Sequence, residues 1–269
     1  MNRNAVWRRD RDVPVMYWPG LEDVGVRAVV TSREGGVSTG PYASLNLGLH
    51  VDDDPAAVLE NRRRAAATVD LELEDLVFCN QAHGREVVTV AAEHRGRGSR
   101  RLDDAIDGVD ALVTGDEGVG LVVMVADCVP IVLADPQAGV IAAVHSGWRG
   151  TVAKVAAATV DSMVAMGCRR ERLVVAIGPA IPPERYEVGD DVEAAAREAF
   201  GKDTPTVVFP REGGRWSFDL WTSNRMVLAE AGIGDDQILA AEYPTGDGTP
   251  FFSDRAKRPC GRFAAIARL

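Results

Sequence analysis

The sequence predicts an α+β fold, a single domain over residues 1–269 in which mixed β-sheets are flanked by helices. Short apolar runs of strand length often follow one another directly, as do Ile131–Ala134 and Val140–Val144, whereas other stretches have helical periodicity. Strands that follow each other as often as they alternate with helices favour a mixed sheet over a doubly wound parallel one. No internal repeat of about 20–50 residues divides the chain, so we expect one domain.

Individual elements follow from local signals. Asp54 is a suitable N-cap with Pro55 at the first helical position, and apolar residues recur with helical spacing from Thr151 to Met166. The charged, glycine-containing stretch Glu93–Gly108 is predicted to be a loop and is the best candidate for a lid. The predicted strands are 26–30, 76–79 and 86–91 (a pair around a turn), 111–114, 121–125, 131–134, 140–144, 173–177, 206–209, 238–243 and 263–267; the predicted helices are 54–69, 151–166, 192–200 and 220–230.

Composition restricts the partners. The formal net charge of −10 argues against nucleic acid or an anionic membrane as the main partner, because both attract basic surfaces. The four cysteines are far apart, which is typical of reduced thiols in a cytoplasmic protein. The N-terminal stretch has no apolar core of a secretory signal, and no run approaches the roughly 18 apolar residues of a membrane span. We therefore expect a soluble, cytoplasmic protein.

Two residues with catalytic chemistry flank the predicted hairpin 131–144. Cys128 precedes its first strand and His145 ends its second, so pairing of the strands would bring the thiol and the imidazole together. Directly after His145 come Ser146-Gly147-Trp148-Arg149-Gly150 and a helix, a strand–turn–helix setting that commonly holds functional groups.

A metal site is one interpretation of this arrangement. The chain has only four histidines, and two of them, His83 and His145, adjoin glycine in predicted strand-end turns. Zinc binds nitrogen and thiolate donors tetrahedrally, and three protein ligands with a free fourth position are typical of catalytic zinc. Nothing in the sequence decides whether His50 lies near this site, and His94 is predicted to be solvent-exposed.

Other interpretations stay open at this point. A lone cysteine before an apolar run is usually a small core residue, and a turn histidine is often a capping residue. Alternatively, Cys128 could be a nucleophile activated by His145, as in a hydrolase or acyl transferase, or the chain could be a pure binding module. A multi-copper oxidase is disfavoured, because one blue-copper centre already uses two histidines and a cysteine, and four histidines cannot also supply a trinuclear cluster.

Several segments together resemble one family. They are TSREGGVSTGPYASLNLG, LENRR, NQAHG, DALVT, ADCVPIVLADP, AAVHSGWRGT, AIGPAI, YEVGDDV and FFSDR, which run in the family's order from about Val26 to the C-terminus. The chain thus resembles the YfiH-like laccase-domain proteins, whose members carry the names polyphenol oxidase and purine nucleoside phosphorylase. Two departures are Asp254, where the family usually has tyrosine, and Tyr243-Pro244-Thr245, where a Cys-Thr pair is common.

The resemblance implies a fold, a cofactor and an activity. It implies an α+β domain, often monomeric, with Zn²⁺ held by His83, Cys128 and His145; Cu²⁺ is the alternative that the oxidase name carries. The implied activity is phosphorolysis of adenosine, guanosine, inosine and methylthioadenosine, with adenosine deamination at the same site. Polyphenol oxidation and an amidase-like editing of peptidoglycan precursors are further implied roles. Purine nucleosides and phosphate are accordingly the expected partners.

The substrate-binding residues can be predicted by type. Arg149 and Arg33 are candidate anion ligands, and the amides of Asn46, Asn80 and Gln81 suit ribose or purine edges. Asp127 is a candidate for orienting a ligand or moving a proton, with a turn cap as its structural alternative. The predicted catalytic residues are Cys128, His145 and Asp127, and the predicted substrate and phosphate ligands are Arg33, Asn46, Gln81 and Arg149.

Overall fold

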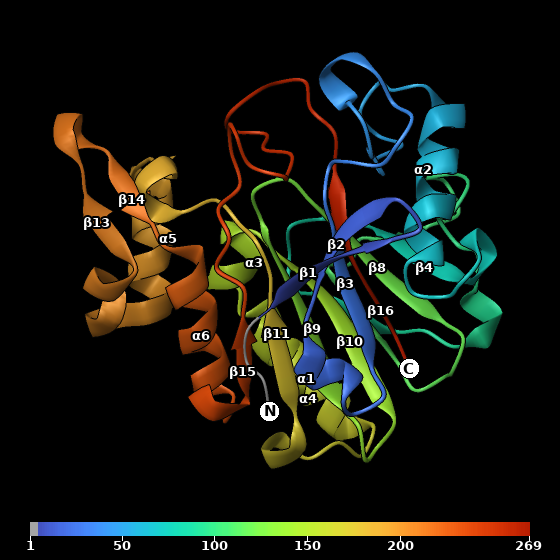
Figure 1. Cartoon of the computed structure of the whole chain (residues 1–269). Helices are drawn as coiled ribbons and strands as arrows, with labels where there is room; N and C mark the ends of the chain where they lie inside the picture. The colour runs from blue at the N-terminus through green and yellow to red at the C-terminus, as the bar shows by residue number, and fades with distance from the viewer. Residues whose placement is uncertain (1–4) are drawn as a thin grey trace.

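Two large β-sheets packed face to face form the centre of the molecule in the computed structural model, which describes residues 5–269 (Figure 1). The first sheet has seven strands in the order β1-β2-β3-β16-β8-β4-β6, and the second has six in the order β15-β11-β9-β10-β7-β5. Both sheets contain parallel and antiparallel neighbours. The strands of the first sheet are β1 (Val6–Asp10), β2 (Val13–Tyr17), β3 (Arg27–Thr31), β16 (Phe263–Arg268), β8 (Gly120–Val125), β4 (Leu76–Asn80) and β6 (Ile106–Asp107); those of the second are β15 (Ile238–Ala240), β11 (Val174–Ile177), β9 (Val129–Asp135), β10 (Val140–Ser146), β7 (Ala111–Thr114) and β5 (Val87–Thr89).

The layering follows from strands that are apolar on both faces. Val123 and Ala265 of the first sheet share one core cluster with Val132 and Ile141 of the second, so these side chains fill the space between the sheets. The outer face of the first sheet is covered by α2 (Pro55–Ala67), and that of the second by α4 (Val155–Ala165) and α6 (Leu220–Glu230). The α+β prediction, with mixed sheets flanked by helices, is confirmed.

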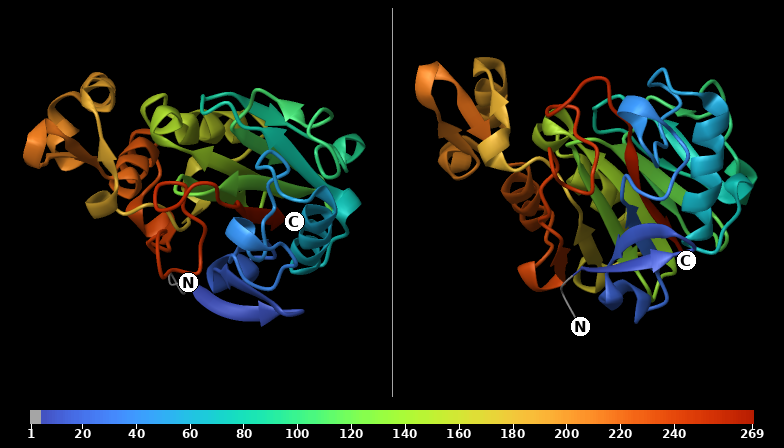
Figure 2. Two further views of the ribbon diagram at one scale, coloured as in Figure 1. Left: turned by 90° about the horizontal axis from the view of Figure 1, so that it is seen from above. Right: turned by 45° about the horizontal axis from the view of Figure 1, so that its top comes forward.

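A smaller unit stands off the main body beside α6 (Figure 2). We call residues 183–219 the arm; it contains α5 (Asp190–Phe200) and a three-stranded sheet of β12 (Glu187–Val188), β14 (Trp216–Phe218) and β13 (Val208–Pro210). Phe200 and Phe218 are buried between these elements and continue the core under α6. The sequence prediction contained α5 and β13 but missed β12 and β14.

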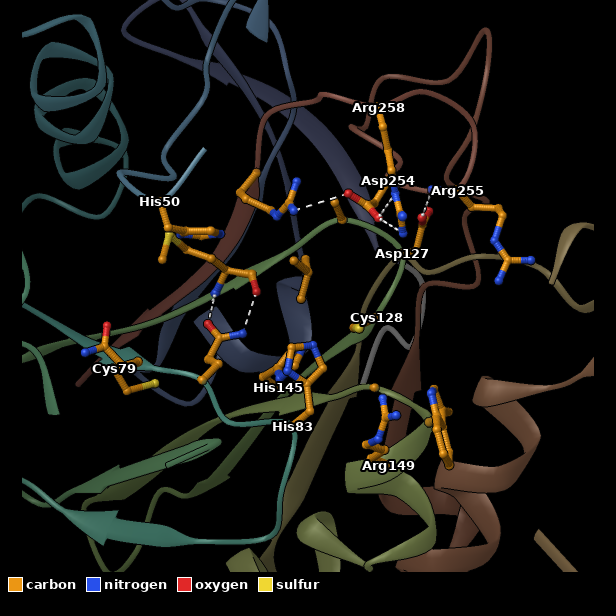
Figure 3. Close-up of a pocket in the computed structure, with 18 of the residues that line it drawn as sticks. His50, Cys79, His83, Asp127, Cys128, His145, Arg149, Asp254, Arg255 and Arg258 are labelled. Carbon is orange, nitrogen blue, oxygen red and sulfur yellow. Dashed lines mark hydrogen bonds and ion pairs between the residues drawn. The ribbon is translucent and has the colours of Figure 1, made fainter. Parts of the chain in front are cut away.

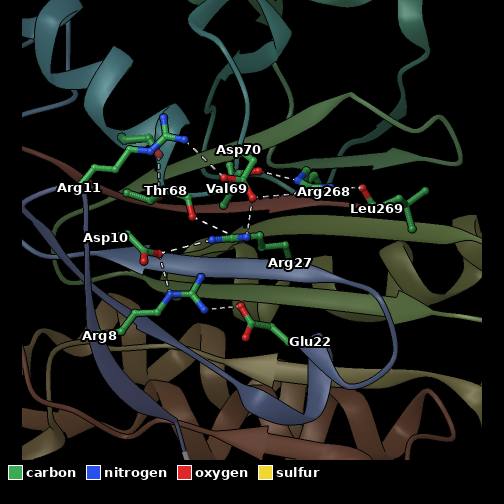
Figure 4. Close-up of polar contacts among 11 residues, drawn as sticks. Arg8, Asp10, Arg11, Glu22, Arg27, Thr68, Val69, Asp70, Arg268 and Leu269 are labelled. Carbon is green, nitrogen blue, oxygen red and sulfur yellow. Dashed lines mark hydrogen bonds and ion pairs between the residues drawn. The ribbon is translucent and has the colours of Figure 1, made fainter.

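Ion pairs and hydrogen bonds attach the turn after α2 to one end of the neighbouring strands β3 and β16 (Figure 4). Arg27 of β3 pairs with Asp70 at 2.5 Å and donates to the carbonyl of Thr68, while Arg268 of β16 donates to the carbonyl of Val69 at 2.5 Å. These contacts fix the turn after α2 against two neighbouring strands. The hairpin of β1 and β2 was not predicted.

Most predicted elements are confirmed, including the β9–β10 hairpin, but two predictions are wrong. Strands β4 and β5 do not pair with each other; β4 pairs in parallel with β8 of the first sheet, and β5 pairs in parallel with β7 of the second. The helix predicted from Thr151 to Met166 is interrupted, because Lys154 has a left-handed backbone (φ 64°) that separates α3 (Trp148–Val152) from α4. Within residues 5–269, no helix is long and apolar enough to cross a membrane. A short helix, α1 (Pro19–Glu22), follows β2.

Candidate metal and substrate site

A cavity of about 600 Å³ opens where the ends of the two large sheets meet the arm and residues 241–262, the C-terminal loop between β15 and β16 (Figure 3). Its size is within the usual range of small-molecule sites. Strand β4 ends at it, β8 leads into it, and β9 and β10 contribute their outer ends. The side chains and backbone that line it belong to His50, Cys79, Asn80, Gln81, His83, Leu102, Met124, Val125, Ala126, Asp127, Cys128, His145, Gly147, Trp148, Arg149, Tyr186, Asp254, Arg255, Arg258 and Arg262.

Three ligand-type side chains converge at the floor of this cavity. Atoms of His83, Cys128 and His145 that can bind a metal all lie within 4.8 Å of one another. Cys128 precedes β9 and His145 is in β10, and the register pairs His145 with Pro130, so the hairpin brings thiol and imidazole together. His83, from the turn after β4, places its ring at right angles to that of His145, with 4.8 Å between the centroids.

A buried carboxylate that the sequence prediction missed organises this group. Asp110 is fully buried, and its Oδ1 lies 2.8 Å from Nδ1 of His145 and accepts the backbone N–H of His83 at 3.0 Å. Its Oδ2 accepts the backbone N–H of Gly84 at 2.6 Å. One side chain therefore orients the ring of His145 and the turn that carries His83. The bond at Nδ1 leaves Nε2 of His145 as the ligand atom, an arrangement common among metal-binding histidines.

The backbone around the three residues is also specialised. His83 has a positive φ of 59°, a conformation that non-glycine residues seldom adopt. A Cβ atom at Gly147 would lie 2.9 Å from Sγ of Cys128, so glycine is needed for the turn to pass this close to the thiol. Ser146 donates to Oδ1 of Asn224 in α6 at 2.7 Å, which attaches the same turn to the helical layer.

Charge favours a thiolate at this site. Burial alone would raise the pKa of Cys128, but the neighbouring His145 and His83 outweigh it and lower the pKa to about 6. Burial would lower the pKa of His145, but the Cys128 thiolate and the Asp110 carboxylate outweigh it and raise the pKa to about 9. The group thus stabilises the deprotonated sulfur that metal binding or nucleophilic attack requires.

The donor set fits a metal ion. Two imidazoles and one thiolate are suitable zinc ligands, the buried Asp110 supports one of the imidazoles, and the adjoining cavity leaves a fourth position for water or substrate. His83, Cys128 and His145 could therefore hold a metal.

Asp127, adjacent to Cys128, forms structural hydrogen bonds to the C-terminal loop, in addition to the catalytic role predicted for it. Its Oδ1 accepts the hydroxyl of Thr245 at 2.5 Å, and its Oδ2 accepts the backbone N–H of Arg255 at 2.7 Å. Asp127 has a positive φ of 93° and is 8% exposed. Its carboxylate attaches the C-terminal loop to the metal-ligand segment and thereby forms one wall of the cavity.

The structure brings some of the predicted substrate ligands to the cavity and leaves others outside it. Gln81 lines the cavity, but its amide is bonded to both the N–H and the carbonyl of Met124 at 2.8 Å. Arg149 lines it too, exposed and stacked on Trp148. Arg33 is absent from the lining; its guanidinium donates to the carbonyl of Ala43.

Of the two predicted asparagines, Asn80 lines the cavity and Asn46 does not. Asn46 lies outside the lining and is fully buried, where its Oδ1 accepts the backbone N–H groups of Gly48 and Arg262. Asn80 lines the cavity and donates to the carbonyl of Leu102 at 3.2 Å. Because Leu102 also lines the cavity, the predicted loop 93–108 does border the site.

Several functional candidates come from segments that had been noted only as family-like motifs. Tyr186 of YEVGDDV and Arg255 of FFSDR line the cavity, as does Asp254, which pairs with Arg258 at 2.5 Å and Arg262 at 3.3 Å. Burial, and then the charge of Arg262, lower the pKa of His50 to about 4, so this lining imidazole is neutral at pH 7.

Comparison with known proteins agrees with this architecture. Residues 27–269 match the family model described as multi-copper polyphenol oxidoreductase laccase. The chain belongs to this family. Its fold matches that of Bacillus licheniformis YfiH with a TM-score of 0.92 and 31% identity, covering 98% of both chains. The crystal structure of YlmD from Geobacillus stearothermophilus also gives a TM-score of 0.92, at 35% identity and 98% coverage of both chains.

Named relatives of this laccase-like family carry two kinds of enzyme name. The chain is 44% identical to a purine nucleoside phosphorylase of Deinococcus radiodurans, with 83% of this chain and 81% of the relative covered. It is 38% identical to adenosine deaminase RL5 from an unknown prokaryotic organism, with 86% and 88% covered.

Proposed function

We propose that this laccase-like chain is a zinc-dependent purine nucleoside phosphorylase that also deaminates adenosine. The observation that carries the proposal is the convergence of His83, Cys128 and His145 at the floor of a cavity that also presents cationic side chains with no carboxylate partner among the described residues. The names of relatives that match over more than four-fifths of their length support the same activity.

Phosphorolysis requires a phosphate oxygen to attack C1′ of the ribose. The C1′–N9 bond breaks, its electron pair stays with the purine, and the purine takes up a proton, giving ribose 1-phosphate and the free base. Holding both reactants in one cavity removes much of the entropic cost of their meeting. Arg149 is free to bind an anion, because its guanidinium forms no hydrogen bond or ion pair with residues 5–269 and only stacks on Trp148.

Deamination replaces the exocyclic amino group of adenine with oxygen from water. Zinc, when bound, supplies a Lewis acid that lowers the pKa of water to about 7. The chain's contribution is to hold His83 and His145 in place through Asp110 and to shape the cavity that orients the purine. Asp127, whose carboxylate attaches the C-terminal loop, keeps that wall in position.

The decisive experiment measures the metal content of the purified protein together with phosphate-dependent release of purine base. We expect close to one zinc per chain, and we expect Cys128→Ala to lose the metal, phosphorolysis and deamination together. The matched control is Cys168→Ala, a buried cysteine in the helix-side core that does not line the cavity. It should retain zinc and both activities.

The result also separates the alternative roles of the thiol. Phosphorolysis that persists in a zinc-free Cys128→Ala protein would remove the metal from the proposal. A second outcome is that an alkylating reagent traps Cys128 covalently while chelators leave the activity unchanged. In that case a mechanism with Cys128 as nucleophile would replace the metal-dependent one. If a panel of nucleosides with phosphate gave no turnover, the enzyme proposal itself would fail.

A further inference from the structure

The arginines that line the cavity fall into two pairs with different surroundings. Arg258 and Arg262 share the single carboxylate of Asp254, which offsets one of their two positive charges. Arg149 and Arg255 are therefore the lining arginines whose guanidinium groups have no carboxylate partner within residues 5–269.

Contacts within the described residues hold Arg255 in position and leave some of its guanidinium N–H groups available to a ligand. Its backbone N–H donates to Asp127 at 2.7 Å, one guanidinium nitrogen donates to the carbonyl of Glu187 at 2.6 Å, and the guanidinium lies 5.2 Å from the centre of the Tyr186 ring. No other acceptor within residues 5–269 bonds its remaining N–H groups. A cation that is fixed in advance loses less entropy when it binds a ligand.

Tyr186 supplies a neutral donor beside these charges. It lines the cavity, and its hydroxyl forms no hydrogen bond with the described residues. Burial and the negative charges of Cys128 and Asp127 raise the pKa of Tyr186, while the positive charges of Arg255 and Arg149 act in the opposite direction. Both guanidinium groups thus lie within electrostatic reach of one phenol. At neutral pH the hydroxyl stays protonated and can donate.

We propose that Arg255 and Tyr186, together with Arg149, form the subsite that binds inorganic phosphate. This inference rests on the phosphorolysis proposed above and replaces Arg33, which does not line the cavity. Guanidinium groups bind phosphate oxygens through charge-assisted, often paired hydrogen bonds, and a phenol can donate to an oxygen that they leave free. The subsite joins the arm, which carries Tyr186, to the C-terminal loop, which carries Arg255.

The test uses adenosine as substrate, because one assay then reports two reactions. Adenine measures phosphorolysis, whereas inosine measures deamination, which consumes no phosphate. We expect Arg255→Gln to raise KM for phosphate by about 10- to 100-fold, as the loss of a charged hydrogen bond implies. We expect Tyr186→Phe to raise it by roughly 3- to 10-fold, as the loss of a neutral one implies. KM for adenosine should change much less, so the ratio of adenine to inosine falls at limiting phosphate.

Two variants make the comparison specific. Arg255→Lys keeps the charge and should recover part of the phosphate affinity. Arg215→Gln removes an exposed arginine of the same arm, which pairs with Glu187 and does not line the cavity, and should leave KM for phosphate unchanged. Circular dichroism and retained zinc establish that each variant is folded.

Direct binding of inorganic phosphate, measured by calorimetry, separates this inference from the proposed function. If the wild-type protein binds phosphate, the two variants weaken that binding, and no turnover is found, the subsite stands while the proposed function fails. If the wild-type protein performs phosphorolysis and folded Arg255→Gln and Tyr186→Phe proteins keep the wild-type KM for phosphate, the subsite is overturned. If Arg255→Gln and Tyr186→Phe weaken inhibition by AMP but leave KM for inorganic phosphate unchanged, the two side chains contact a nucleotide phosphate. The inference is then likewise overturned.

Discussion

Replacing Asp110 by asparagine tests how the candidate metal site is organised. The carboxylate accepts three hydrogen bonds, from the backbone N–H groups of His83 and Gly84 and from the ring of His145. An asparagine of the same shape has one acceptor oxygen and one amino group. If its oxygen stays with His83 and His145, its amino group faces the N–H of Gly84, and two donors oppose each other.

The expected magnitudes follow from this count. One charge-assisted hydrogen bond is lost in a fully buried position, so the free energy of unfolding of the metal-free protein should fall by about 1.5–3 kcal/mol. The imidazole of His145 also loses the negative charge that orients it, and loss of such a partner typically weakens metal binding by about 10- to 100-fold. Urea unfolding in the presence of a chelator measures the first quantity, and a competitive zinc titration measures the second.

The control for this change is Asp103→Asn. Asp103 lies on the surface with 72% of its side chain exposed, and Arg101 is its only ion-pair partner within residues 5–269. It should change the unfolding free energy by no more than about 0.5 kcal/mol and leave zinc affinity unchanged. Zinc affinity within twofold of wild type in Asp110→Asn would refute the role assigned to the carboxylate.

Two further changes test the turn beside the thiol and a buried ion pair. Gly147→Ala should lower zinc affinity, because its Cβ would lie 2.9 Å from Sγ of Cys128; a zinc titration equal to wild type would contradict this. Asp135 is fully buried and pairs with Arg172 at 2.7 Å, so Asp135→Asn should destabilise the fold by about 2–3 kcal/mol in urea at pH 7. Burial alone would raise the pKa of Asp135, but the N–H of Arg169 and the charge of Arg172 outweigh it and lower the pKa. The folded state therefore binds this proton less readily than the unfolded state, and the stabilisation should be complete above about pH 4 and disappear as the pH falls further; a difference that persists undiminished in acid would contradict the ion-pair explanation.

The site was predictable from the sequence where its geometry is local. The β9–β10 hairpin sets the distance between Cys128 and His145, and a turn between two apolar runs is a short-range signal. The role of Asp110 was not predictable in this way. A single aspartate before an apolar strand has no distinctive pattern, and its contacts to residues 26 and 35 positions away exist only once β7 lies between β5 and β10.

The same reasoning explains the two wrong elements. Strands β4 and β5 have the composition and spacing of a hairpin, but each finds a better edge in a different sheet, beside β8 and β7. Such a choice depends on long-range pairing, which turn residues do not encode. The break between α3 and α4 is at Lys154, a residue with ordinary helix propensity, while the apolar spacing continues across it. Because α3 is only five residues long, the anion binding proposed at this turn would depend on the charge of Arg149 rather than on a long helix dipole.

The family description names multi-copper oxidation, and the donor chemistry of this chain bears on that name. A laccase-type reaction needs a mononuclear copper and a separate trinuclear cluster, which together require many more imidazoles than four. His94 uses its Nδ1 to accept the backbone N–H of Ala91, and His50 lies in the cavity beside the positive charge of Arg262, which disfavours a bound cation. His83 and His145 remain, and with Cys128 they suffice for one ion. The side chains thus match a single zinc, or a single copper, far better than a multi-copper centre, and metal analysis should return one ion per chain.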